Sequence, residues 1–330
     1  MMKSVVALIL LCSTPALADA AGPLRPAHTY SIVARDPNTG EMGVAVQSHW
    51  FSVGTSVTWA EAGVGAVATQ SFVRIEYGPE GLGLMKDRVP AAEALERLVR
   101  ADPGRDVRQV AMIDAAGRAS AWTGGKCIPA AGHHVGDGYS VQANLMLDAG
   151  VWPAMAAAFE SASGDLAARM MAALEAAQAA GGDIRGRQSA AIKIVKAKSS
   201  GKPWADTVVN LRIEDAPEPI VELRRLLTLW RAYEHMNAGD LAVEKNDLDA
   251  AVAHYGAAEA MVPQMDEFVF WHAATLAQNG RLDAALPLFR RAFILQPGWY
   301  LLAPRLPDVG LLPKDAAALG RILAQGPHAK

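Results

Sequence analysis

A threonine stands at the head of a strand-forming stretch, Thr29-Tyr-Ser-Ile-Val-Ala-Arg35, and the turn Pro37-Asn-Thr-Gly40 joins it to the run Met42–Ser48. Two short apolar runs joined by such a turn predict a β-hairpin. A threonine made N-terminal by cleavage carries its own base, because its α-amine, with a pKa of about 7.7–8.0, can accept the hydroxyl proton. Thr29 is therefore a candidate nucleophile if cleavage makes it N-terminal. The alternative is that Thr29 only begins an ordinary strand.

Two amide side chains stand two positions apart in the predicted strand Tyr139–Met146. Because side chains alternate along a strand, Gln142 and Asn144 face the same side. An amide N–H can stabilise the oxyanion of a tetrahedral intermediate, and removing one such donor commonly costs about 10²–10³ in rate. Asn144 is the first candidate for this donor and Gln142 the second. The alternative is that both amides satisfy buried backbone groups.

Four further polar residues are candidates for substrate binding. Ser31 shares a strand face with Thr29, and Gln70 lies at the polar end of an otherwise apolar run, where a pocket rim is expected. Asp183 and Arg185 stand in a glycine-rich block, and a guanidinium group matches a carboxylate in two-point geometry. The alternatives are an ordinary strand end at Gln70 and a structural Asp–Arg pair that holds a helix-to-strand turn.

Residues typical of metal or cofactor sites do not occur in the required patterns. Cys127 and the pair His133-His134 lack the paired spacing of zinc ligands, so we expect no metal and a buried, inert Cys127. The sequence has no phosphate-binding loop, dinucleotide fingerprint or Gly-x-Ser-x-Gly elbow. We therefore expect no organic cofactor.

The hairpin and the string Gly63-Val-Gly-Ala-Val-Ala-Thr-Gln-Ser71 together resemble the domain of unknown function 1028 family, from about Thr29 to Leu211. That family has been grouped with the N-terminal nucleophile (Ntn) hydrolases. The resemblance implies an α+β fold, a four-layer αββα sandwich. It also implies a hydrolase of carbon–nitrogen bonds, an Ntn-type amidohydrolase in which Thr29 attacks a small amide, lactam or peptide-like bond.

The first residues predict an exported protein. Residues 1–18 have the basic, apolar and small-residue regions of a signal peptide, so we expect a periplasmic or secreted protein. Residues 19–28 then form a spacer or pro-segment that blocks the amine of Thr29. Autoproteolysis or another protease must remove this segment for the mechanism to operate. If neither does, the protein is a catalytically silent Ntn-like scaffold that binds a ligand or protein of the cell envelope.

Residues 29–213 mix predicted strands with two helical blocks. The strands are expected at 30–35, 42–48, 63–71, 107–113, 118–123, 139–146, 189–195 and 208–213. One helix is expected to start near Pro79 and continue past Pro90 to Arg100, and a second block covers Trp152–Ala180 with a restart at Asp165. Hairpins with helices inserted in two blocks indicate an α+β domain.

Residues 214–221 read as a linker, and residues 222–330 as a helical domain with an internal repeat. Five residues recur 34 positions on, which is the period of tetratricopeptide repeats. They are Gly239, Ala251, Tyr255, Ala258 and Pro263, matched by Ala273, Ala285, Phe289, Ala292 and Pro297. We expect a peptide or protein partner in the concave groove of these repeats.

Charge and hydrophobicity bear on two further classes of partner, nucleic acid and membranes. The formal net charge of −3 and the lack of basic clusters argue against nucleic acid, and no segment after the leader is apolar enough to span a membrane. The sequence leaves open a homo-oligomer and a third function, a ligand sensor for an assembly of the cell envelope.

Overall fold

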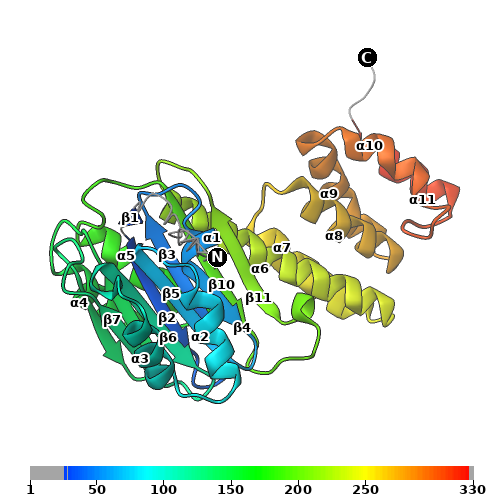
Figure 1. Ribbon diagram of the computed structural model, residues 1–330. Helices are drawn as coiled ribbons and strands as arrows, with labels where there is room; N and C mark the ends of the chain where they lie inside the picture. Colours follow the sequence, from blue (N-terminus) through cyan, green and yellow to red (C-terminus); the bar gives the residue numbers. More distant parts are fainter. Residues whose placement is uncertain (1–25, 28, 327–330) are drawn as a thin grey trace, which may run out of the picture.

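The computed structural model describes residues 26–27 and 29–326, which form two antiparallel sheets with flanking helices, followed by a helical region (Figure 1). Sheet A contains β1 (Pro26–Ala27), β4 (Thr58–Glu61), β5 (Gly65–Phe72), β6 (Arg108–Asp114) and β7 (Ala119–Thr123). Sheet B contains, in spatial order, β11 (Thr207–Ile213), β10 (Ser189–Val195), β3 (Met42–Ser48), β2 (Thr29–Arg35), β9 (Tyr139–Ala143) and β8 (Gly132–Gly136). The predicted leader, 1–18, and most of the spacer lie outside the described residues.

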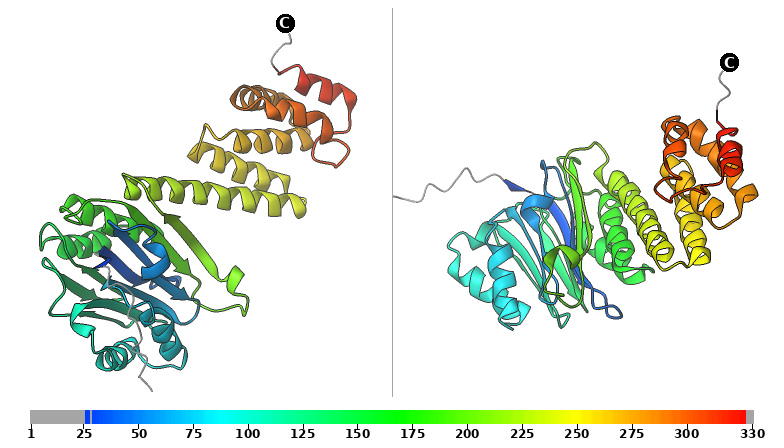
Figure 2. Two further views of the ribbon diagram at one scale, coloured as in Figure 1. Left: turned by 45° about the horizontal axis from the view of Figure 1, so that its top comes forward. Right: turned by 90° about the vertical axis from the view of Figure 1, so that its right-hand side faces the viewer.

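Helices cover the outer face of each sheet, so the first part of the chain is layered as helices, sheet A, sheet B and helices (Figure 2). The covering helices are α2 (Tyr77–Lys86) and α3 (Ala91–Ala101) on sheet A, and α4 (Val151–Ser161) and α5 (Leu166–Ala179) on sheet B. Val110 packs under α2 and α3, whereas its neighbour Ala111 packs between the sheets. This alternation lets one strand serve two cores, which is why the central strands are apolar on both faces.

The predicted hairpin of β2 and β3 is confirmed, with Thr29 opposite Ser48 and Arg35 opposite Met42. Its turn is held by Asp36, whose carboxylate accepts the backbone N–H groups of Asn38 and Thr39 at 2.8 and 2.9 Å. Turns closed by an aspartate in this way are common in proteins. The hairpin fixes Thr29 at one end of sheet B.

The predicted continuous helix through Pro90 is wrong. Helix α2 ends at Lys86 and α3 begins at Ala91, with Arg88 between them at a φ of 68°. Proline has no N–H for the helical ladder, and it disfavours a helical conformation in the residue before it. The restart predicted at Asp165 is confirmed, because its carboxylate accepts the N–H of Ala168 at 2.7 Å and caps α5.

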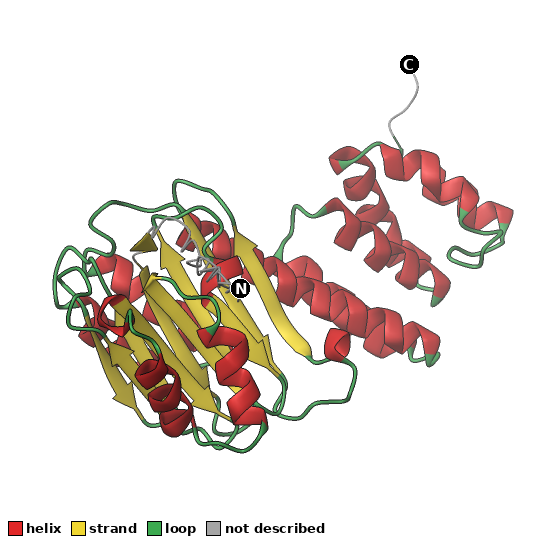
Figure 3. Cartoon of the chain, viewed as in Figure 1, coloured by secondary structure: helices red, strands yellow, loops and turns green. Residues whose placement is uncertain are grey.

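Beyond β11 the described residues contain helices and no strand (Figure 3). The helices are α6 (Pro219–Glu244), α7 (Leu248–Met261), α8 (Asp266–Gln278), α9 (Leu282–Leu295), α10 (Gly298–Leu302) and α11 (Ala316–Leu323). Elsewhere, three shorter helical turns lie before β11: α1 (Gly54–Val57) and the 3₁₀ segments 105–107 and 203–205. A further 3₁₀ segment, 303–305, lies in the helical region. The first half of α6 packs on the domain of the two sheets through Leu223 and Leu227. The mixed α+β domain and the all-helical region after it are thus confirmed.

Apart from the two prolines, which are exposed between helices, the residues that recur at a 34-residue offset are buried in the helical region. A Cβ atom on Gly239 of α6 would lie 2.5 Å from the ring of Tyr255 of α7, so glycine allows these two helices to approach closely. Phe289, the counterpart of Tyr255, is fully buried. Among the helices of residues 26–326, none is long and apolar enough to cross a membrane.

Candidate functional site

The side chains between the two sheets change from apolar to polar toward the end of the sandwich where β2 begins. Val33 packs between the sheets, whereas Ser31 and Thr29, two and four residues earlier on the same face, are polar. We call this group of polar side chains between the sheets the polar layer. It consists of Thr29, Ser31, Ser48, Gln70, Gln109, Ser140, Gln142, Asn144 and Ser189, and every one of these side chains is fully buried. None of the nine carries a titratable carboxyl, imidazole, thiol or amine.

Thr29 contacts several groups of this layer. Its hydroxyl donates to Ser48 Oγ at 3.2 Å. Its carbonyl accepts the backbone N–H of Asn144 at 3.1 Å and Nε2 of Gln70 at 3.2 Å. The head of β2 is therefore tied both to β9 of its own sheet and to β5 of the opposite sheet.

Gln109 of β6 is the centre of the amide network. Its Oε1 accepts Nε2 of Gln70 at 2.7 Å and Nδ2 of Asn144 at 2.8 Å. Its Nε2 donates to the carbonyl of Ala143 at 2.9 Å and to Oγ1 of Thr123 at 2.8 Å. Buried amides of this kind are stable only when their partners are present, so Gln109 fixes the orientation of the other two.

A second chain of bonds orients Gln142. Its Nε2 donates to Ser31 Oγ at 2.5 Å, and its Oε1 accepts the hydroxyl of Ser140 at 3.1 Å. Ser31 in turn donates to Oε1 of Gln70 at 2.6 Å. Hydroxyl and amide groups thus form one connected network across both sheets.

Two residues in the left-handed region directly follow site amides. Ser71, after Gln70, has a φ of 70°, and Leu145, after Asn144, has a φ of 57°. Such a conformation is uncommon outside glycine, and it costs about 1–3 kcal/mol when the surroundings impose it. Strained residues of this kind cluster at functional sites. Their position therefore favours a functional site at the end of the sandwich that carries Gln70 and Asn144.

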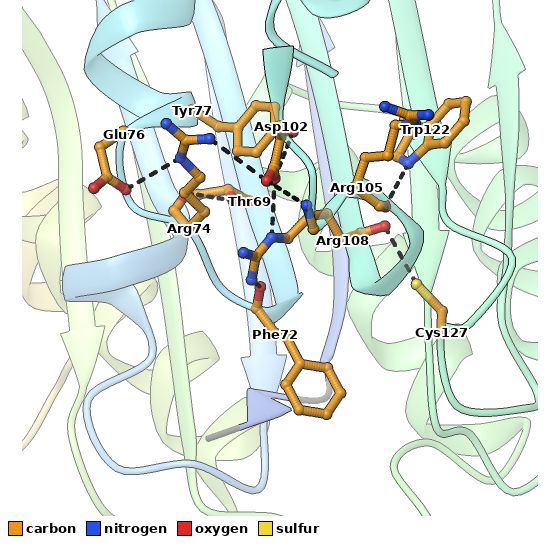
Figure 4. A network of polar contacts seen from close by, with 11 residues as sticks. Thr69, Phe72, Arg74, Glu76, Tyr77, Asp102, Arg105, Arg108, Trp122 and Cys127 are labelled. Atoms are coloured by element: carbon orange, nitrogen blue, oxygen red, sulfur yellow. Dashed lines mark hydrogen bonds and ion pairs between the residues drawn. The ribbon is translucent and has the colours of Figure 1, made fainter. Parts of the chain in front are cut away.

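Figure 4 shows a charged network beside the ends of β5 and β6. These two strands carry Gln70 and Gln109. Asp102 accepts Nε of Arg108 at 3.1 Å and the hydroxyl of Tyr77 at 3.0 Å, and Arg108 also donates to the carbonyl of Phe72. Burial alone would raise the pKa of Asp102, but the hydrogen bonds from Gly104 N–H, Arg108 and Tyr77 hold that pKa below its usual value. The anionic Asp102 therefore joins β5, β6 and α2.

The predicted residues Asp183 and Arg185 lie in a loop beside the polar layer. Arg185 binds Asp183 through Nε at 3.0 Å and a terminal nitrogen at 2.7 Å, and the N–H of His49 donates to the same carboxylate at 3.2 Å. Residue 183 also forms an isolated β-bridge with Met146. These contacts tie the loop to the ends of β3 and β9.

Cys127 and His133, which the sequence offered as possible metal ligands, contact different groups at this end of the sandwich. Cys127 is buried, donates to the carbonyl of Arg108 at 3.3 Å, and has its pKa raised by burial, so it carries little thiolate at neutral pH. Nδ1 of His133 lies 2.8 Å from Thr123 Oγ1, and burial and His134 lower its pKa. No group of three metal-ligating side chains occurs in the part of the chain that the structure describes.

The structure brings five of the seven predicted site residues into one network: Thr29, Ser31, Gln70, Gln142 and Asn144. Asp183 and Arg185 lie in the neighbouring loop. Sequence reasoning missed four residues of the polar layer: Ser48, Gln109, Ser140 and Ser189. A signal for Gln109 was present, because it is an uncharged polar residue directly before the apolar run of β6, two positions before Ala111 on the same face.

Comparison with known proteins agrees with this fold. Residues 29–223 match a family described as a family of unknown function, DUF1028. A crystal structure of a protein of that family from Silicibacter pomeroyi is 30% identical, covers 61% of this chain and 88% of its own, and superposes with a TM-score of 0.54. No protein with a curated description matches the chain.

Proposed function

The chain belongs to the DUF1028 family, and we propose that it is an exported Ntn-type amidohydrolase acting on a small amide, lactam or peptide-like bond. The observation that carries the proposal is the position of Thr29. It is the first residue of β2, and its hydroxyl lies in a network of hydroxyl and amide groups between the sheets. The order of helices, sheet, sheet and helices supports an αββα sandwich of the Ntn type.

The chemistry follows from the groups present. The Thr29 hydroxyl attacks the carbonyl carbon of the substrate while its proton passes to the α-amine, and the proton then moves to the departing amine. Water hydrolyses the resulting ester and restores the threonine. The polar layer contains no titratable side chain, so the α-amine is the base that this set of residues otherwise lacks. Amide N–H groups such as Nδ2 of Asn144 would stabilise the oxyanion.

This mechanism requires cleavage of the bond between residues 28 and 29. Strand β1, which precedes Thr29, pairs with Ser71 and Phe72 of β5 in sheet A, whereas Thr29 starts β2 in sheet B. The chain therefore passes from one sheet to the other directly before Thr29. Thr29 is fully buried, so the proposed cleavage must both free the amine and expose the hydroxyl.

A second candidate function is a silent Ntn-like scaffold that binds a ligand or protein of the cell envelope. Complete burial of the polar layer favours it. For the helical region we propose tetratricopeptide-like repeats with a peptide or protein partner. The buried positions at the 34-residue offset support this assignment.

The deciding experiment combines N-terminal sequencing with acylation by a β-lactone probe. The exported protein should begin at Thr29, and mass spectrometry should place the adduct on that residue. Thr29→Ala should abolish labelling, and Thr29→Ser should keep part of it because a hydroxyl remains. Asn144→Ala should lower kcat more than it changes KM, by about 10²–10³, since an oxyanion donor acts in the transition state.

Thr69→Ala is the matched control. Thr69 is also buried, but its hydroxyl donates to the carbonyl of Arg74 at 3.0 Å, away from the polar layer. This variant should lose a similar amount of stability and keep the label. An adduct on Cys127 or Ser31 would contradict the assignment of Thr29. A stable N-terminus before Thr29 in a labelled, active sample would exclude the free-amine mechanism.

A further inference from the structure

A cavity of about 550 Å³ lies between α6 and α8 in the helical region. This volume is typical of ligand pockets, which measure roughly 300–1,000 Å³. Residues of α6 and α8 form most of its walls, and Tyr255 of α7 and Leu311 complete the lining. The proposed hydrolase mechanism does not use this cavity.

The charged groups of the lining have one sign. Asp240, Glu244 and Glu267 line the cavity, and its lining contains no lysine, arginine or histidine. The hydroxyl of Tyr233 donates to Oε2 of Glu267 at 2.8 Å, and that of Tyr255 donates to Oδ1 of Asp240 at 2.5 Å. Each tyrosine engages one carboxylate oxygen, and a carboxylate can accept further hydrogen bonds. The tyrosines therefore hold two carboxylates in place without neutralising them.

The end of α6 adds to this negative potential. Glu244 is the last residue of the helix, whose C-terminal end carries a partial negative charge; the last turn contains no basic residue, and Lys245 follows as the capping residue. A carboxylate is unfavourable at this position, whereas a cation is favourable. A bound cation would thus be attracted by both the side chain and the helix terminus.

Aromatic and amide groups complete the lining. Tyr233 is 37% exposed and Trp271 is half-buried, so both rings are accessible from the cavity. Aromatic rings attract a guanidinium or ammonium group over their faces, and arginine also stacks on them. Asn237 adds an amide beside the carboxylates. Carboxylates together with aromatic rings suit a cation on an apolar stem.

We propose that this cavity binds a cationic side chain, arginine or lysine, of a polypeptide partner. Charge complementarity identifies the cation. The polypeptide is favoured because Leu311, an apolar residue of the lining, is 43% exposed, and residues flanking the cation would cover it. This inference rests on the proposed peptide-binding role of the helical region and is independent of the reaction at Thr29.

The test uses the purified full-length chain and isothermal titration calorimetry with acetyl-Gly-Arg-Arg-Gly-amide. A peptide with citrulline in place of both arginines is the uncharged control of nearly the same shape. The arginine peptide should bind at least tenfold more tightly. Glu244→Gln should weaken its binding by about three- to tenfold, as expected for one charge at a few ångströms near the surface. Added salt should weaken it further.

Asp249→Asn is the matched control variant, because Asp249 is an exposed carboxylate of α7 outside the lining and the change in net charge is the same. Its affinity should stay within twofold. The indole N–H signal of Trp271, assigned with Trp271→Phe, should shift on binding. Equal binding of the citrulline peptide, no binding of the arginine peptide at millimolar concentration, or an unaffected Glu244→Gln would overturn the proposal. No readout depends on turnover, so failure of the hydrolase proposal would be distinguishable.

Discussion

Replacing Gln109 by leucine tests whether its amide holds the polar layer together. Leucine has nearly the same volume, so the change removes hydrogen bonds while creating little cavity. Gln70 Nε2 and Asn144 Nδ2 lose acceptors at 2.7 and 2.8 Å. The carbonyl of Ala143 loses a donor at 2.9 Å. The variant therefore separates the polar contribution of Gln109 from its packing.

The expected loss follows from the contacts that remain. A buried donor left without its partner costs about 1–3 kcal/mol. Both donors keep longer contacts to the carbonyl of Thr29, at 3.2 and 3.5 Å, so the lower end applies to each. The total is about 2 kcal/mol, which corresponds to roughly 4–8 °C in Tm for a domain of this size.

Differential scanning calorimetry of the full-length chain measures the effect. Gln296→Leu is the control, because Gln296 is an exposed residue at the end of α9, where the same chemical change should alter stability by less than about 0.5 kcal/mol. If Gln109→Leu unfolds at the wild-type temperature, the amide network does not stabilise this end of the sandwich and the argument fails. A rise in Tm would show that the polar layer opposes folding more strongly than its bonds support it.

Two further predictions concern other parts of the chain. Asp102→Asn should lower the Tm at pH 7, and the difference in Tm from wild type should shrink below about pH 4. The pKa of Asp102 is held low in the folded protein, so its stabilisation is complete above the unfolded pKa of about 3.9 and is lost as the pH falls through the folded pKa. A difference in Tm that stays constant with pH would contradict this. Gly239→Ala should destabilise the helical region by about 1–3 kcal/mol, because the added Cβ meets the ring of Tyr255. The control Gly320→Ala in α11 has open space around the added Cβ and should be neutral or stabilising. Equal denaturation midpoints for the two variants would refute the packing argument.

Local patterns in the sequence were sufficient for some parts of the site. The turn after Arg35 fixed the hairpin that carries Thr29, and the period of two placed Gln142 and Asn144 on one face, where the structure has them. Both inferences depend on neighbouring residues only. They need no knowledge of which strands lie side by side or which sheet faces which.

Contacts between the sheets were beyond the sequence. Gln70 meets Ser31 and Gln109, each 39 residues away, because β5 lies across from β2 and beside β6. Strand order and sheet stacking decide these pairings, and neither follows from alternation within one strand. The short strands β4 and β8 were also not predicted from the sequence. Their own apolar pattern is weak, and they form mainly because they pair with the neighbouring strands β5 and β9.

The division of the layer between the sheets bears on function. A core required only for stability would continue with the small apolar residues of its other end, because buried amides contribute little net stability even when fully bonded. Instead Ala111 gives way to Gln109, and Ala68 to Gln70, two positions along the same strands. The polar end therefore favours a role in binding a polar group once it is opened. In the proposed mechanism, a new chain terminus at Thr29 supplies the proton acceptor.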